Sequence, residues 1–125
     1  MASPYENRAR NRNGSLPPEV VTGLEEAGGL EKIQASLPDE STIRTLAERH
    51  QALSDQVRIS ILFYLRGSDL CPCVLKDLTG LSDSKLSYHL SILEKAGMAE
   101  WRQNKNWRVY RLTGLGRSYL DGKTI

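Results

Sequence analysis

Cys71 and Cys73 are the two cysteines of a 125-residue chain, and a single proline separates them in the stretch "DLCPCVL". Thiolates bind soft metal ions and react with oxidants. Side chains two residues apart point to nearly opposite sides of a regular helix. Pro72, however, disfavours helical backbone at Cys71 and suits the first position of a helix. We therefore predict that Cys71 caps a helix in extended conformation and that Cys73 lies in its first turn, where the helix dipole favours thiolate.

This spacing leaves three interpretations of the cysteine pair. The thiols could bind a thiophilic ion, oxidise to each other or to a small thiol, or simply pack as small apolar residues. Each chain offers two thiols, whereas a tetrahedral ion takes four ligands and trivalent arsenic prefers three thiolates. The remaining ligands could come from Asp69, Asp77, a water, an exogenous thiol or a second subunit.

The chain divides by composition into three parts. Residues 1–17 are polar and basic with little to bury, which predicts a disordered arm that is either a solvated tail or a source of phosphate contacts. Residues 18–38 carry apolar residues at helical spacing, interrupted at Gly28 and Gly29, and we predict a dimerising helical segment. Residues 39–125 are predicted to form the main domain, which is long enough for one modest core.

The main domain contains a helix-turn-helix pattern. One helix is predicted between Ser54 as its cap and Gly67 as its end. The cysteines then open a short helix in which Leu75 and Leu78 are expected to point inward, with Gly80 closing it. A three-residue turn follows, as is typical of two helices in this motif.

The second helix of the motif begins after Ser82 and ends at Gly97, with a buried stripe of Leu86, Leu90 and Leu93. The stretch "MAEWRQNKNWRVYRL" then predicts a β-hairpin, whose two tryptophans we expect to serve packing in the core and the hairpin. A short helix follows at residues 115–120. This order predicts a mainly α fold with a small β-hairpin, a winged helix-turn-helix.

The start of this second helix suits the major groove of DNA. The leucine stripe leaves hydroxyl, cationic and aromatic side chains on the exposed side, although such residues are also ordinary on a solvated helix. Hydroxyls reach phosphates or base edges, Lys85 can approach guanine, and Tyr88 can touch a thymine methyl. The candidate contacts are Ser82, Ser84, Lys85, Ser87, Tyr88 and His89.

The predicted hairpin is basic. Residues 82–111 contain six Lys or Arg and three Asp or Glu, a net charge of +3 that exceeds the +2 of the whole chain. Positive charge concentrated beside a recognition helix is typical of a phosphate-binding surface. The predicted contacts in this wing are Arg102, Lys105 and Arg108.

Four stretches together resemble the ArsR/SmtB family of winged-helix repressors: "HQALSDQVRISILFYL", "DLCPCVLKDL", "LSDSKLSYHLSILEKAGM" and "WRQNKNWRVYRL". The resemblance covers roughly residues 46–112. It implies a homodimeric, DNA-binding transcription factor that senses an inducer, commonly a metal or metalloid ion. His89 could by itself be a core histidine or a metal ligand, and the resemblance places it on the DNA side.

The stretch "DLCPCVL" is similar to the cysteine box of arsenic-, cadmium- and lead-responsive family members. It departs from that box at Val74, where an acidic residue commonly follows the second cysteine. The family's other metal site uses acidic and histidine residues on a C-terminal helix. Because "LGRSYLDGKTI" contains no histidine, we expect that zinc-type site to be absent.

We therefore expect a repressor released from a palindromic operator when As(III), Cd(II), Pb(II) or Zn(II) binds Cys71 and Cys73, with no ion required for the fold. The alternatives are a thiol redox-sensing repressor and a winged-helix protein-interaction module. The sequence contains no recognisable catalytic arrangement, so we do not expect an enzyme. The absence of a leader or a long apolar run predicts a cytoplasmic protein without membrane contact.

Overall fold

The chain divides into two compact units, residues 1–40 and residues 41–125, and the computed structural model describes residues 16–122 of them. The basic arm predicted for residues 1–17 lies outside the described residues except for its last two positions. Each unit is considered by itself. None of the helices in residues 16–122 is long and apolar enough to cross a membrane.

The first unit contains two short helices, α1 (Pro18–Glu26) and α2 (Leu30–Ala35). Gly28 and Gly29 separate them with φ values of 91° and 102°, a backbone region that favours glycine, so the predicted interruption is confirmed. Neither helix contains a buried residue, and the apolar side chains of this segment are 38% to 65% exposed at Leu30, Ile33, Val20 and Leu37. Its role in dimerisation stays a prediction.

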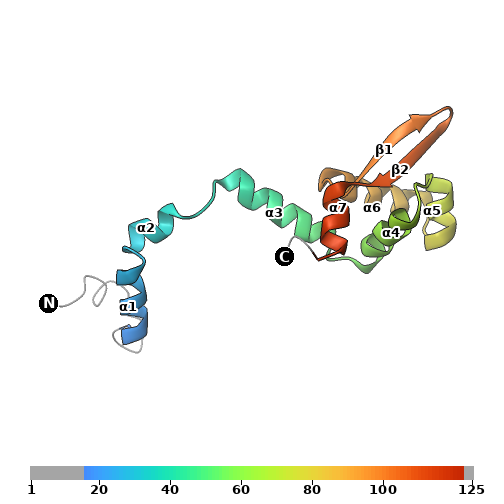
Figure 1. The fold of residues 1–125 in the computed structure, drawn as a ribbon. Coiled ribbons are helices and arrows are strands. Elements are labelled where there is room, and N and C mark those ends of the chain that lie inside the picture. Colours follow the sequence, from blue (N-terminus) through green and yellow to red (C-terminus); the bar gives the residue numbers. More distant parts are fainter. Residues whose placement is uncertain (1–15, 123–125) are drawn as a thin grey trace. The chain divides into compact units, whose positions relative to one another are not determined.

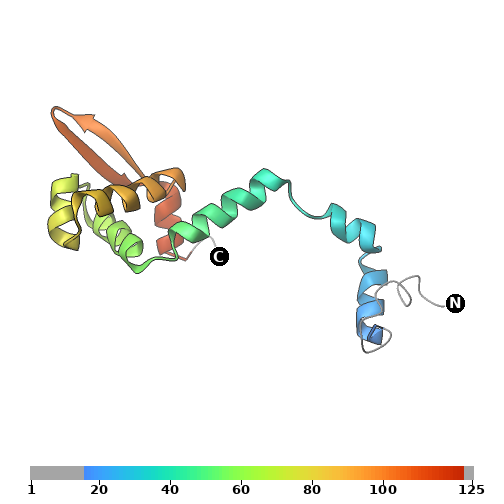
Figure 2. The same cartoon turned by 180° about the vertical axis from the view of Figure 1, so that it is seen from behind.

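The second unit has the predicted order of elements (Figure 1). It contains α3 (Glu40–Ala52, starting at the unit boundary), α4 (Gln56–Gly67), α5 (Pro72–Thr79), α6 (Asp83–Lys95), β1 (Ala99–Asn104), β2 (Trp107–Leu112) and α7 (Gly114–Leu120). The two strands form an antiparallel hairpin that projects from the helices. From behind, α6 runs across the helical body from the side of α5 (Figure 2). The winged helix-turn-helix fold is confirmed.

One hydrophobic core holds this unit together. The predicted stripe of Leu86, Leu90 and Leu93 is buried, which places one face of α6 against the core. Ile61 and Leu62 of α4 are fully buried in the same cluster. The core therefore fixes which side of α6 remains outside.

Two local predictions were wrong. Asp55, rather than Ser54, caps α4, because its carboxylate accepts hydrogen bonds from the backbone N–H groups of Val57 and Arg58 at 2.8 and 3.2 Å. Ser54 instead donates its hydroxyl to an α3 carbonyl. Leu78 is 45% exposed rather than inward, since α5 is only eight residues long and buries Leu75 alone.

Helix α7 is joined closely to the hairpin. Thr113 donates its hydroxyl to the carbonyl of Gly97 at 2.6 Å and accepts the backbone N–H of Gly116 at 3.0 Å. A Cβ at Gly116 would lie well inside van der Waals contact with the backbone carbonyl of Met98 and with the side chain of Leu112. The start of α7, one residue earlier than predicted, therefore packs against the end of the hairpin.

We expect Gly116→Ala to lower the free energy of unfolding by about 1–3 kcal/mol, because backbone must move to admit the methyl group. Gly114→Ala is the matched control in the same helix, since a Cβ there meets nothing within 4 Å. Thermal or urea unfolding measures both. Equal stability of the two variants would contradict the packing described for Gly116.

Candidate nucleic-acid interface and cysteine site

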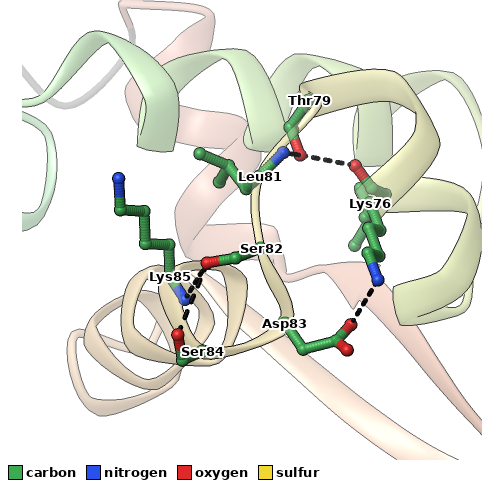
Figure 3. Close-up of polar contacts among 8 residues, drawn as sticks. Lys76, Thr79, Leu81, Ser82, Asp83, Ser84 and Lys85 are labelled. Atoms are coloured by element: carbon green, nitrogen blue, oxygen red, sulfur yellow. Dashed lines mark hydrogen bonds and ion pairs between the residues drawn. The ribbon is translucent and has the colours of Figure 1, made fainter.

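The turn between α5 and α6 has well-defined local geometry. Gly80 adopts the left-handed conformation, with φ 71° and ψ 11°, and its N–H donates to the carbonyl of Lys76 at 2.8 Å. Thr79 donates its hydroxyl to the carbonyl of Leu75 and accepts the backbone N–H of Leu81. Lys76 and Asp83 form an ion pair at 3.1 Å across the turn (Figure 3). These contacts set the angle at which α6 leaves α5.

The predicted DNA contacts on α6 lie at its N-terminal end. Ser82 is the N-cap, because its hydroxyl oxygen accepts the backbone N–H of Lys85 at 3.3 Å, and it lies 3.4 Å from the hydroxyl of Ser84 (Figure 3). Tyr88 is 62% exposed. The exposed predicted contacts on this helix are Ser82, Ser84, Lys85, Ser87 and Tyr88.

His89 differs from these residues because it is half-buried. Its Nδ1 lies 3.0 Å from Nη1 of Arg58, and its ring makes an edge contact with the Tyr88 ring at 5.3 Å. A guanidinium can only donate, so Nδ1 accepts and the proton of the neutral ring lies on Nε2. One nitrogen of His89 is thus engaged inside the protein.

Arg58 is the residue that the sequence interpretation missed. It is 7% exposed, and its guanidinium also donates to the backbone carbonyls of Ala52 at 2.9 Å and Gln51 at 3.2 Å. The available signal was an arginine inside the otherwise apolar run "QVRISILFYL". Charged residues are rarely buried without partners, so such a position predicts a polar network.

The hairpin keeps its predicted cations exposed. Arg102, Lys105 and Arg108 are all exposed, whereas Arg111 is paired with Glu100 at 3.2 Å. The Arg108 guanidinium lies 4.2 Å from the ring centre of Trp101, a cation–π contact on one face of the hairpin.

The two tryptophans pack on the hairpin surface. Trp101 and Trp107 are 39% and 56% exposed, so the prediction that they contribute to the core was wrong. The hairpin extends beyond the helical body, and its outer part therefore has no core to contact. Trp101 instead supports the guanidinium of Arg108.

The cysteine pair adopts the predicted backbone. Cys71 is the N-cap of α5 with φ −82° and ψ 160°, Pro72 is the first helical residue, and Cys73 lies in the first turn. Both thiols are free, with Cys71 half-buried and Cys73 exposed. A hydrogen bond from the Cys73 thiol lowers the pKa of Cys71, and the same interaction raises the pKa of Cys73. This hydrogen bond therefore favours a pair that holds one thiolate and one thiol.

The residue before Cys71 is hydrogen-bonded to the hairpin. The N–H of Leu70 donates to the carbonyl of Tyr110 at 3.0 Å, and the N–H of Tyr110 donates back at 2.8 Å. A cavity of about 470 Å³ opens beside this pair, with Cys71 on one side and Lys105 and Trp107 of the hairpin on the other. The cysteine segment and the wing are thus connected by backbone hydrogen bonds and line the same cavity.

In the part of the chain that the structure describes, the two cysteines have no further metal-binding side chains grouped with them. Among residues 16–122, no three or more His, Cys, Asp or Glu side chains form a group that could hold a metal ion. Asp69 lines the cavity beside Cys71, whereas Asp77 does not. The chain thus offers the two thiols as its soft ligands, and neither acidic candidate completes a three-ligand group with them.

Comparison with known proteins places this architecture in a family. Residues 55–100 match the model of the family described as "Bacterial regulatory protein, arsR family". The chain is 31% identical over 111 residues to a putative arsenical resistance operon repressor ArsR of Halobacterium salinarum, a match that covers 87% of this chain and 83% of the relative. The chain belongs to the arsR family. The family resemblance and the predicted class, a DNA-binding transcription regulator, are confirmed.

Other arsR-family comparisons agree. An arsenical resistance operon repressor of Bacillus subtilis is 36% identical over 72 residues, covering 56% of this chain and 68% of the relative. A winged helix-turn-helix DNA-binding domain from Mycobacterium bovis superimposes with a TM-score of 0.62 at 23% identity, covering 72% of this chain and 85% of that one. At that identity the solved structure supports the fold of this arsR-family protein. These relatives are regulators by name.

Proposed function

We propose that this arsR-family protein represses transcription by binding operator DNA and is released when a thiophilic ion binds Cys71 and Cys73. The observation that carries the proposal is the backbone pairing of Leu70 with Tyr110, because it joins the thiol segment directly to the DNA-binding hairpin. The names of the two sequence relatives, arsenical resistance operon repressors, support a metalloid inducer.

The DNA surface in this proposal combines two elements. The N-terminal end of α6 enters the major groove with the exposed side chains of Ser84, Lys85, Ser87 and Tyr88, while Ser82 caps the helix beside the phosphates. The wing adds Arg102, Lys105 and Arg108, whose exposed cations contact the DNA backbone.

A homodimer would present two such surfaces to successive major grooves, which predicts a palindromic operator. The Mycobacterium bovis domain is described as homodimeric, and the first unit of this chain exposes apolar helix faces. We infer that residues 18–38 contribute to the dimer interface. We also infer that the protein is cytoplasmic, where it would meet its operator DNA.

The residues fit a thiophilic ion in part. Cys71 and Cys73 supply two soft ligands at a helix N-terminus, and the lowered pKa of Cys71 favours the thiolate that such ions require. We propose that an exogenous thiol or a group of the second subunit completes the site for As(III), Cd(II), Pb(II) or Zn(II), with As(III) supported by the relatives' names.

Release follows from the connections of Cys71. Drawing the two sulfurs together changes the start of α5 and moves Leu70, which is hydrogen-bonded to β2. The wing and the turn into α6 then leave the arrangement that fits DNA. By linkage, an inducer that binds the DNA-free conformation better lowers DNA affinity by the same factor.

A redox switch at the same cysteines is the second candidate. The thiols are hydrogen-bonded to each other, and Cys73 is exposed to small oxidants and thiols. Oxidation of both thiols by a peroxide would form a disulfide between Cys71 and Cys73. The two thiol protons leave in two molecules of water when the oxidant is hydrogen peroxide, or in one water and one alcohol when it is an organic peroxide. The same movement of Leu70 would follow.

Fluorescence anisotropy with labelled promoter DNA from the protein's own operon tests the proposal. Reduced protein should bind with an affinity that falls steeply as salt rises, and one of the four ions should release it. Release by peroxide alone would identify the redox switch. Binding that is weak and insensitive to salt would contradict the DNA-binding surface and favour the protein-interaction module.

A further inference from the structure

Arg58 connects three elements of the second unit. Its guanidinium, carried by α4, donates to the carbonyls of Gln51 and Ala52 at the end of α3 and lies 3.0 Å from Nδ1 of His89 in α6. It is 7% exposed and is the one buried charged side chain among the residues that the structure describes. A buried charge persists only where hydrogen bonds replace its lost hydration, so these three contacts constrain one another.

The geometry of the Arg58 guanidinium fixes how its contacts with α3 and α6 are arranged. The group is planar, with its donors in a fixed fork, so one side chain holds the α3 carbonyls and the His89 ring in a single relative position. The carbonyls of Gln51 and Ala52 are at the C-terminus of α3, the end of a helix that attracts a cation, and the Gln51 carbonyl also accepts the backbone N–H and the hydroxyl of Ser54. A hydrogen bond from the backbone N–H of Arg58, and attraction to its guanidinium, lower the pKa of Asp55 and keep a countercharge nearby.

The contact at His89 acts directly on the DNA-binding surface. His89 follows Tyr88 immediately and lies one helical turn after Lys85, so a shift of α6 at His89 carries both of those side chains with it. Its Nδ1 faces inward to Arg58, which leaves only Nε2 for any contact outside.

We propose that Arg58 is a positioning residue for operator binding, acting through Nδ1 of His89 to hold the recognition helix α6 against the end of α3. The proposal rests on the proposed DNA binding. It assigns His89 an indirect role, in place of the direct DNA contact expected from the sequence.

The two roles differ in what they require of the His89 ring. The groups that face His89 are the Arg58 guanidinium and the Asp55 carboxylate from the start of α4, and the Tyr88 ring from its own helix. A positioning role requires only the acceptor that Nδ1 offers to Arg58. A direct DNA contact by His89 would instead require Nε2, the nitrogen that does not face Arg58.

The test measures operator affinity of the full chain for wild type, His89→Leu and His89→Asn. His89→Leu removes the acceptor for Arg58 and should lose about tenfold in affinity, the scale of one charge-assisted hydrogen bond. His89→Asn places an amide oxygen where Nδ1 lies and offers nothing at the position of Nε2, so it should restore most of this loss. Melting temperatures of each variant separate unfolding from the loss of DNA binding.

A double-mutant cycle of Arg58→Lys with His89→Leu provides the second readout, because residues that act through one contact lose affinity less than additively. If Arg58→Lys fails to fold, the affinities of His89→Leu and His89→Asn still decide the question. A loss in His89→Asn as large as that in His89→Leu, or additive losses in the cycle, would overturn the positioning role while leaving DNA binding established. Absence of salt-sensitive DNA binding by wild type would overturn both proposals.

Discussion

Replacing both thiols, in Cys71→Ser/Cys73→Ser, is expected to leave operator affinity within about twofold and to abolish release by As(III). Serine is nearly isosteric and can still cap α5, so the fold and the Leu70–Tyr110 pairing should persist. Allosteric coupling between two sites typically amounts to about 5–150-fold in affinity, and all of it should disappear when the soft ligands are removed. Anisotropy titrations with and without the ion measure the difference.

The matched control is Val74→Ala, which trims the side chain beside the cavity but keeps both thiols. It should retain release. If the double serine variant still releases DNA when As(III) is added, the inducer site lies elsewhere and the cysteine proposal is wrong. Loss of operator binding in the serine variant itself would instead show that the thiols support the folded start of α5.

Release should also depend on pH. The hydrogen bond from Cys73 lowers the pKa of Cys71, while the pKa of Cys73 is raised, so ion binding must displace at least the Cys73 proton. Raising the pH removes that proton in advance, whereas lowering it protonates both thiols. The ion concentration needed for half release should therefore fall as pH rises, and a titration series between pH 6.5 and 8.5 measures this.

The second large effect is expected from the wing. Arg102→Gln/Arg108→Gln should weaken operator binding by about 100-fold or more at low salt, because hydrogen bonds to charged groups contribute about 1.5–3 kcal/mol each. The dependence of log affinity on log salt should become shallower by about two, one unit for each lost phosphate contact. Affinity measured at several salt concentrations gives both quantities.

Arg111→Gln is the control on the same hairpin. It removes the same charge, but the Arg111 guanidinium is already paired with Glu100 at 3.2 Å, so the salt dependence should change little. Because Arg108 also lies over Trp101, melting temperatures must show that the hairpin variants remain folded. An unchanged salt dependence in the double variant would exclude the wing from the DNA surface.

Local chemistry explains how much of the cysteine site could be predicted from sequence. Pro72 restricts the backbone of its neighbour, so the extended Cys71 and the first-turn Cys73 follow from three adjacent residues. The leucine stripe of α6 depends on spacing alone in the same way. Both features depend on interactions between residues close in sequence, and tertiary packing leaves them unchanged.

Predictions from the sequence were wrong where the chain could form two local structures equally well. Ser54 and Asp55 are both good caps, and only the folded path of the α3–α4 turn decides which side chain reaches the free N–H groups of α4. Leu78 has the right spacing to be buried, but α5 is short and Leu78 lies at the edge of a cavity beside α4, where it stays 45% exposed. Which apolar residue is inside depends on neighbouring elements that spacing does not specify.

The sequence by itself determined the family, the order of helices and hairpin, the exposed side chains at the start of α6 and the conformation of the cysteine pair. Only the tertiary structure decided that Leu70 is hydrogen-bonded to Tyr110, 40 residues later, and that Arg58 meets His89 at a separation of 31. Contacts between distant residues depend on how the core brings α3, α4, α6 and the hairpin together. The physical reason is that periodicity specifies which face of an element is buried, but not which partner it meets.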